Sequence, residues 1–158
     1  MPLSETIRKF LDENRVRYEL LSHPRAITAQ EVAQTVHITG KEVAKCVIVQ
    51  ADGMTRMVVL PASRRLNLEK LKTHLDAEEI RLAKENEFRD LFPDSEIGAM
   101  PPFGTLYGLP VHLDVSLMSF PEIVFNACTH TEVLKISLSD FEKLVKPGVG
   151  DFSEVPIS

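Results

Sequence analysis

The spacing of apolar and polar residues along the chain predicts helices and strands in mixed order. Ile7, Phe10 and Leu11 are spaced as on one face of a helix, and Ser4 stands where an N-terminal cap would. Residues 111–117 alternate between apolar and polar side chains, which is typical of a half-buried strand. With the capping and turn residues around them, such patterns predict helices at 4–14, 28–39, 68–74, 84–91 and 137–146. They predict strands at 18–21, 43–50, 54–60, 111–117, 122–126 and 133–136.

Helices interspersed with strands indicate an α/β or α+β fold around one predominantly antiparallel, curled sheet. Ala51, Asp52 and Gly53 separate two β-rich runs and are a strong hairpin signal. The 158 residues, 44% hydrophobic and 26% charged, suit one compact domain over 1–158. Pro147 and Gly148 end the last helix, and we expect the tail that follows them to be loosely held.

The charge of the chain is uneven, although its net value is −5. Seven basic and three acidic residues give the segment 41–72 a charge of +4, while the rest of the chain carries −9. Such a basic segment on an acidic body could hold a short stretch of phosphates without wrapping nucleic acid broadly, although a solvated charged face is the simpler explanation.

The sequence gives no sign of a membrane span, a disulfide framework or a zinc site. No apolar run approaches the roughly 20 residues that a spanning helix needs. Cys46 and Cys128 do not form a CxxC pair, and we expect two free thiols in a cytoplasmic protein. No metal and no cofactor is predicted.

The segment 98–104, Gly-Ala-Met-Pro-Pro-Phe-Gly, is a stiff loop without charged or nucleophilic side chains. Its prolines restrict φ, and its glycines permit close approach of a ligand to the backbone. Such a loop can offer backbone N–H groups to a carbonyl or phosphate oxygen, with Phe103 as an apolar wall. An ordinary surface turn would have the same composition.

Lys45 is the one charged residue in the apolar run 43–49. Strand alternation puts it on one face with Val47 and Val49. A lysine in that position either extends to solvent at the strand end or points into a pocket where it meets an anion.

Two further pairs of residues could share a strand face. Cys128 and His130 could form a thiol and base pair, although a small buried cysteine is the commoner reason for such a residue. His112 and Asp114 could form an orienting pair, or belong to a half-exposed polar strand face, which we favour.

Three motifs in this order and spacing resemble the YbaK/ProX family of aminoacyl-tRNA deacylases: Lys45 within residues 40–49, the loop 98–104, and Glu-Ile-Val-Phe-Asn-Ala at 122–127. The resemblance covers about 4–147. It implies a compact α/β domain with a mixed, mostly antiparallel, barrel-like sheet flanked by helices. It also implies hydrolysis, in trans, of the ester that joins a wrong amino acid to tRNA, with this chain as a free-standing member.

The resemblance assigns site residues by position. Lys45 matches the lysine that the family requires for activity, and we predict Lys45 and Gly98 as catalytic. The predicted substrate-binding residues are Pro101, Pro102, Phe103, Gly104, Val47, Asn126 and His130. The family pattern differs at Cys128, where many relatives have glycine.

The expected partner is the acceptor end of a mischarged tRNA, with an aminoacyl-tRNA synthetase as a second partner to test, and the chain is expected to be a monomer. Two other functions remain open from the sequence. One is a binding module that recognises aminoacyl-tRNA or a nucleotide-like ligand without turnover, because Cys128 replaces a glycine. The other is a thiol hydrolase that uses Cys128 and His130.

Overall fold

The computed structural model of the chain describes residues 4–22, 43–96, 99–129 and 131–155. The predicted helix at 28–39 and the predicted site residues Gly98 and His130 lie outside these ranges. The helices are α1 (Glu5–Glu13), α3 (Leu68–Leu75), α4 (Glu85–Phe88) and α5 (Leu138–Val145), with the 3-10 helices η1 (Arg89–Leu91), η2 (Gly104–Tyr107) and η3 (Val115–Ser119). The strands are β1 (Tyr18–Ser22), β2 (Ala44–Ala51), β3 (Met54–Pro61), β4 (Arg65–Leu66), β5 (Ile80–Leu82), β6 (Val111–Asp114), β7 (Glu122–Asn126), β8 (Glu132–Ser137), β9 (Gly148–Gly150) and β10 (Ser153–Glu154).

Local side-chain hydrogen bonds begin three of the helices where the sequence predicts. The Ser4 hydroxyl accepts from the Ile7 N–H at 3.1 Å, and the Ser137 hydroxyl accepts from the Asp140 N–H at 3.1 Å. Asn67 caps α3 in the same way. Each cap satisfies a backbone donor that has no partner within the helix. The hairpin is confirmed as well, since Asp52 and Gly53 have φ of 50° and 78° between β2 and β3.

The described strands form three open sheets rather than a closed barrel. The largest has the order β5-β2-β3-β6-β9, and the others are β1-β8-β7 and β10-β4. All pairs are antiparallel except β3 with β6 and β6 with β9. A single parallel bridge between Val43 and Val124 joins the start of β2 to β7. The mixed, mostly antiparallel α/β fold is confirmed.

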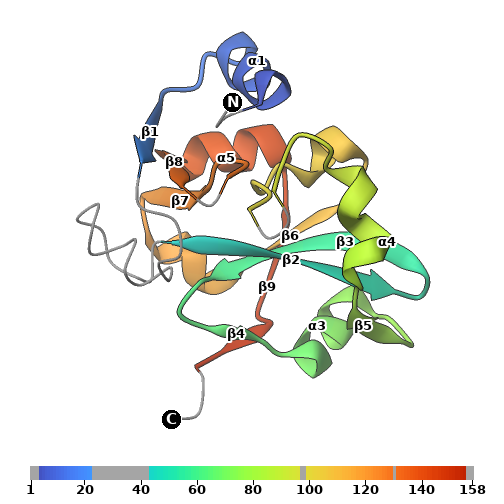
Figure 1. Cartoon of the computed structure of the whole chain (residues 1–158). Helices are drawn as coiled ribbons and strands as arrows, with labels where there is room; N and C mark the ends of the chain where they lie inside the picture. The colour runs from blue at the N-terminus through green and yellow to red at the C-terminus, as the bar shows by residue number, and fades with distance from the viewer. Residues whose placement is uncertain (1–3, 23–42, 97–98, 130, 156–158) are drawn as a thin grey trace.

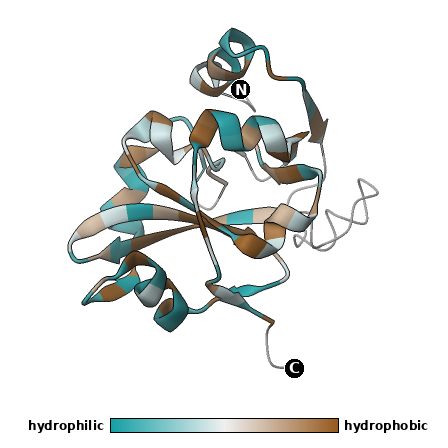
Figure 2. Cartoon of the chain, turned by 180° about the vertical axis from the view of Figure 1, so that it is seen from behind, coloured by the Kyte–Doolittle hydropathy of each residue, from teal (hydrophilic) through white to brown (hydrophobic). Residues whose placement is uncertain are grey.

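The β2–β3 hairpin separates two apolar clusters. Ala44 and Ile48 of β2 pack with Met57 and Val59 of β3 in the larger cluster, which includes residues of α1, α5 and the three-stranded sheet. Alternate positions such as Val49 of β2 enter the smaller cluster with α3 and the C-terminal segment. Figure 1 shows this layering, with α1, α5, β7 and β8 above β2 and β3 and with α3 and β4 below them. Figure 2 shows the chain from behind, coloured by hydropathy. The central strands are mainly apolar, whereas the helices have both polar and apolar residues, as amphipathic helices that pack on a sheet do.

The sequence patterns mislead in three places. The strand predicted at 111–117 ends at Asp114 and continues as η3, because the Asp114 carboxylate accepts from the N–H of Ser116 two residues later. The helix predicted at 84–91 is divided into the short α4 and η1. The tail predicted to be loose is held for most of its length, since β9 pairs with β6 and β10 pairs with β4.

Asp114 anchors this tail. Its carboxylate accepts hydrogen bonds from the N–H of Phe152 at 3.0 Å and from the hydroxyl of Ser153 at 2.7 Å, and both residues are fully buried. The hydroxyl of Ser116 donates to the same carboxylate. Asp114 is therefore a buried, hydrogen-bonded group rather than a member of a half-exposed strand face.

The carboxylate of Asp114 is expected to make folding sensitive to acid. Burial raises the pKa of Asp114, but hydrogen bonds from Ser116, Phe152 and Ser153 outweigh it and hold the pKa below its usual value. Its stabilising contribution is therefore present above the unfolded pKa of about 3.9 and lost as the pH falls through the lower folded pKa. Asp114→Asn should lower the free energy of unfolding at pH 7 by about 1–3 kcal/mol, and it should weaken the acid dependence.

Urea unfolding of both proteins at pH 7 and at pH 3 measures this effect. Asp151→Asn is the matched control, because Asp151 is an exposed carboxylate of the same segment. Equal acid sensitivity in Asp114→Asn and the unsubstituted chain would show that ionisation of this carboxylate does not contribute to the free energy of unfolding.

Candidate functional site

Lys45 lies at the start of β2, on the sheet face away from the larger cluster. It pairs with Leu60 of β3 and shares its face with Val47, as alternation predicts. The side chain is half-buried, and burial lowers the pKa of its ammonium group below the usual value. Within the described ranges the ammonium group of Lys45 makes no hydrogen bond or ion pair. A partly desolvated cation without a partner is well suited to meet an anionic or strongly polar group of a ligand.

Asn126 follows the junction of the two sheets, as Lys45 does. A single parallel bridge joins Val43 to Val124, and each of the two side chains comes two residues after its end of this bridge. Phe125 of β7 enters the larger cluster, and Asn126 therefore points to the opposite face. The structure thus brings Lys45, Val47 and Asn126 together on one face.

Cys128 fastens the end of β7 to the segment that leads into the loop. The N–H of Glu96 donates to the carbonyl of Cys128 at 2.7 Å, and the N–H of Cys128 donates to the carbonyl of Ala99 at 3.1 Å. The N–H of Ala99 donates back to the carbonyl of Glu96 at 3.0 Å. These hydrogen bonds hold the loop entrance against the end of β7, where Ala127, Cys128 and Met100 belong to the larger cluster.

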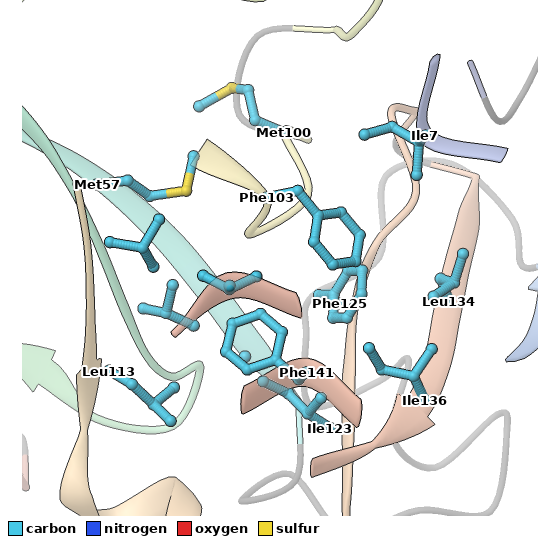
Figure 3. Close-up of a cluster of buried hydrophobic side chains, with 14 of the residues drawn as sticks. Ile7, Met57, Met100, Phe103, Leu113, Ile123, Phe125, Leu134, Ile136 and Phe141 are labelled. Atoms are coloured by element: carbon cyan, nitrogen blue, oxygen red, sulfur yellow. The ribbon is translucent and has the colours of Figure 1, made fainter. Parts of the chain in front are cut away.

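The rest of the loop is buried in the larger cluster. Pro101, Pro102, Phe103 and Gly104 are all buried, and the Phe103 ring is fully enclosed. Its centroid lies 5.4 Å from that of Phe125 in an edge-to-face contact, with further ring contacts to Phe10 and Phe141 (Figure 3).

A Cβ on Gly104 would lie 3.0 Å from Val111 and 3.2 Å from the sulfur of Met57, so this glycine permits the close packing of the loop on the sheet. Phe103 and Gly104 therefore lie on the other side of β2 from Lys45, and their role in binding a substrate remains a prediction.

Comparison with known proteins identifies the family. The model of the aminoacyl-tRNA editing domain family matches residues 23–144. The chain belongs to this family. Among curated relatives, the proline–tRNA ligase of Thermosipho melanesiensis is 34% identical over 94 residues, which is 59% of this chain and 16% of that enzyme. The proline–tRNA ligase of Syntrophus aciditrophicus is 28% identical over 107 residues, 66% of this chain and 18% of that enzyme. The chain thus spans less than a fifth of the length of these relatives.

Solved structures show the same fold over nearly the whole editing domain. A crystal structure of a hypothetical protein superposes with a TM-score of 0.84 at 24% identity, covering 95% of this chain and 100% of the other. A structure described as a candidate trans-editing enzyme for prolyl tRNA synthetase gives a TM-score of 0.83 at 23% identity, covering 96% and 99%. At this level of identity the likeness establishes the fold.

The basic segment 41–72 of this editing domain has fewer cations available to bind an anionic ligand than its sequence suggests. Arg65 pairs with Glu154 at 2.7 Å, and Lys70 pairs with Asp151 at 3.5 Å. Both carboxylates come from the tail that the sequence predicts to be loose. The segment is therefore partly neutralised, and Lys45 and Arg64 are cations within it that have no carboxylate partner among the described residues.

No described side chains supply a metal site or a membrane span. Among the described residues, no three His, Cys, Asp or Glu side chains gather closely enough to ligate a metal ion. None of the helices in the same ranges has the length and apolar character of a membrane span.

Cys128 occupies a backbone conformation that favours glycine. Its φ is 74°, and its side chain is 1% exposed. A side chain in the left-handed region costs about 1 kcal/mol, a cost that glycine would avoid at this position. The backbone of Cys128 thus has the conformation that glycine, the residue expected here from the family resemblance, adopts most readily.

We expect Cys128→Gly to unfold at a higher urea concentration than Cys128→Ala, with a difference of about 1 kcal/mol in the free energy of unfolding. Both substitutions remove the thiol, so their comparison isolates the backbone. Cys46→Gly and Cys46→Ala are the control pair in β2, where alanine should be the more stable. The same order at both positions would mean that no strain exists at Cys128.

Proposed function

We propose that this chain hydrolyses the ester bond of mischarged aminoacyl-tRNA, with the acceptor end of the tRNA bound beside Lys45. The observation that carries the proposal is the half-buried Lys45, whose ammonium group has no partner among the described residues, on the same face as Asn126 in a chain of the editing family. The proline–tRNA ligase relatives make tRNA for proline the first substrate to test.

The proposed chemistry asks for positioning and charge rather than for a nucleophilic side chain. An aminoacyl ester is already activated, and the neighbouring ribose hydroxyl or a bound water can take part in the attack. Lys45 holds the terminal phosphate or ribose and places positive charge near the carbonyl oxygen that becomes negative. Partial burial strengthens this interaction, because fewer water molecules screen it. Gly98 is proposed to offer its N–H to the same oxygen, and Val47 is proposed to contact the amino-acid side chain.

Lys45→Met keeps most of the length of the side chain and removes its charge. Incubation with tRNA for proline carrying alanine, serine or cysteine should reveal the substrate of the unsubstituted chain, and the same tRNA carrying proline is the correctly charged control. The variant should hydrolyse that substrate at least about 100-fold more slowly, because a preorganised charge at the transition state is lost. Lys9→Met, at an exposed position of α1, is the control. An unchanged rate in Lys45→Met would remove Lys45 from the mechanism.

The thiol alternative makes the opposite prediction. The thiol of Cys128 is buried in the larger cluster, and burial raises the pKa of Cys46, which keeps that thiol protonated. Cys128→Ala should therefore retain deacylation to within about threefold, since the rate does not depend on the thiol. Loss of activity in a variant that remains folded by circular dichroism would favour the thiol mechanism.

The binding-module alternative rests on Cys128 replacing a glycine. Cys128 nevertheless adopts the backbone conformation of a glycine and makes both hydrogen bonds to the loop segment, so the feature that raised this alternative leaves the local backbone in place. We propose the cytoplasm, where translation occurs, as the site of action.

A further inference from the structure

A groove of about 450 Å³ opens where β3 ends, and it lies outside the site described above. Its polar wall comes from Arg64, Ser63 and Ser119, and its apolar wall comes from Pro61, Phe120 and Val155. The volume lies within the range of sites that bind small organic ligands. A groove with a cation, hydroxyls and an aromatic ring combines the groups that contact the phosphate, ribose and base of a nucleotide.

Pro61, which lines the groove, adjoins the start of β2. Pro61 pairs with Ala44, the neighbour of Lys45. The N–H of Ala62 donates to the carbonyl of Val43 at 2.7 Å, and the N–H of Arg64 donates to the carbonyl of Pro61 at 3.0 Å. The turn that carries Arg64 is thus joined to Val43 by a hydrogen bond, and the residue before the turn, Pro61, is paired with Ala44.

Arg64 also lies on the sheet face of Lys45. Its guanidinium contacts Ser153, whose hydroxyl donates to Asp114. Asp114 follows Leu113, which is paired with Val59, so it lies beside Leu60 on the face that Lys45 shares. The guanidinium of Arg64 is therefore on the same face of the sheet as Lys45.

The guanidinium of Arg64 is fixed by neutral acceptors. Its Nε donates to the Ser153 hydroxyl at 2.7 Å, and its Nη2 donates to the Ser153 carbonyl at 3.1 Å. No described carboxylate pairs with it, whereas its neighbour Arg65 is paired with Glu154. Asp114 stands behind Ser153 and already accepts from three residues. Arg64 is thus held in place with its charge available to an anion.

We propose that this groove binds the 3′-terminal nucleotides of the tRNA acceptor strand, with a phosphate on Arg64 and a base against Phe120. This placement rests on the proposed function, because the aminoacyl ester at the end of the same strand is proposed to bind beside Lys45. The hydroxyls of Ser63 and Ser119 face the ribose and the phosphate oxygens, while the hydroxyl of Ser116 is already engaged with Asp114.

The test measures binding and turnover separately. The probe for binding is the 5′-phosphorylated ribotrinucleotide CCA, titrated against the full chain at fixed low salt. Arg64→Gln should weaken its binding about tenfold, as expected for the loss of one charge-assisted contact. In deacylation, the same variant should raise KM about tenfold and leave kcat within about threefold, because Arg64 holds the substrate rather than the reacting atoms. Arg65→Gln, at the neighbouring paired arginine, should leave both measurements unchanged.

A second variant guards against misfolding of Arg64→Gln. Ser119→Glu introduces a negative charge at an exposed position of the groove that makes no hydrogen bond in the described ranges, and it should also weaken CCA binding about tenfold. Unchanged CCA binding in Ser119→Glu, or in a folded Arg64→Gln, would overturn the groove proposal even if deacylation proceeds. Arg64-dependent CCA binding without hydrolysis of any mischarged tRNA would support the groove and contradict the proposed function.

Discussion

The alternation of β2 between two apolar clusters is the constraint on which the rest of the structure depends. Ala44 and Ile48 must face the larger cluster, and the intervening positions therefore face the other way. A shift of one residue would bury Lys45 in the larger cluster and expose Ala44, which the cost of burying an unpaired charge forbids. The hydrophobic effect thus fixes the direction of the one charged side chain in this run, with no bond to that side chain from the described residues.

The features predicted correctly from sequence are those with local causes. Ser4, Asn67 and Ser137 each bond a backbone N–H three residues along, and Asp52-Gly53 form their turn from their own backbone preferences. The face shared by Lys45 and Val47 follows from alternation alone. These features can be predicted without knowing which element packs against them, and the folded structure keeps them.

The features that sequence reasoning missed depend on distant partners. Strands β4, β9 and β10 are two or three residues long and have no periodicity of their own, so they exist only because another strand offers an edge. The end of β6 depends on whether the Asp114 carboxylate bonds to Ser116. Phe103 illustrates the same limit in the site: composition indicates an apolar ring in a loop, but the positions of Phe10, Phe125 and Phe141 decide that it belongs to the core.

The attachment of the tail to Asp114 bears on where this fold can be cut or transplanted. The family match ends at residue 144, whereas Phe152 fills part of the smaller cluster and Ser153 holds both Asp114 and Arg64. A fragment trimmed to residues 23–144 would lose β9 and expose the edge of β6. An exposed strand edge can pair with a strand of another molecule and promote aggregation. It would also lose α1, whose Ile7 and Leu11 are fully enclosed. Grafting this module into another protein therefore calls for boundaries set by packing rather than by sequence similarity.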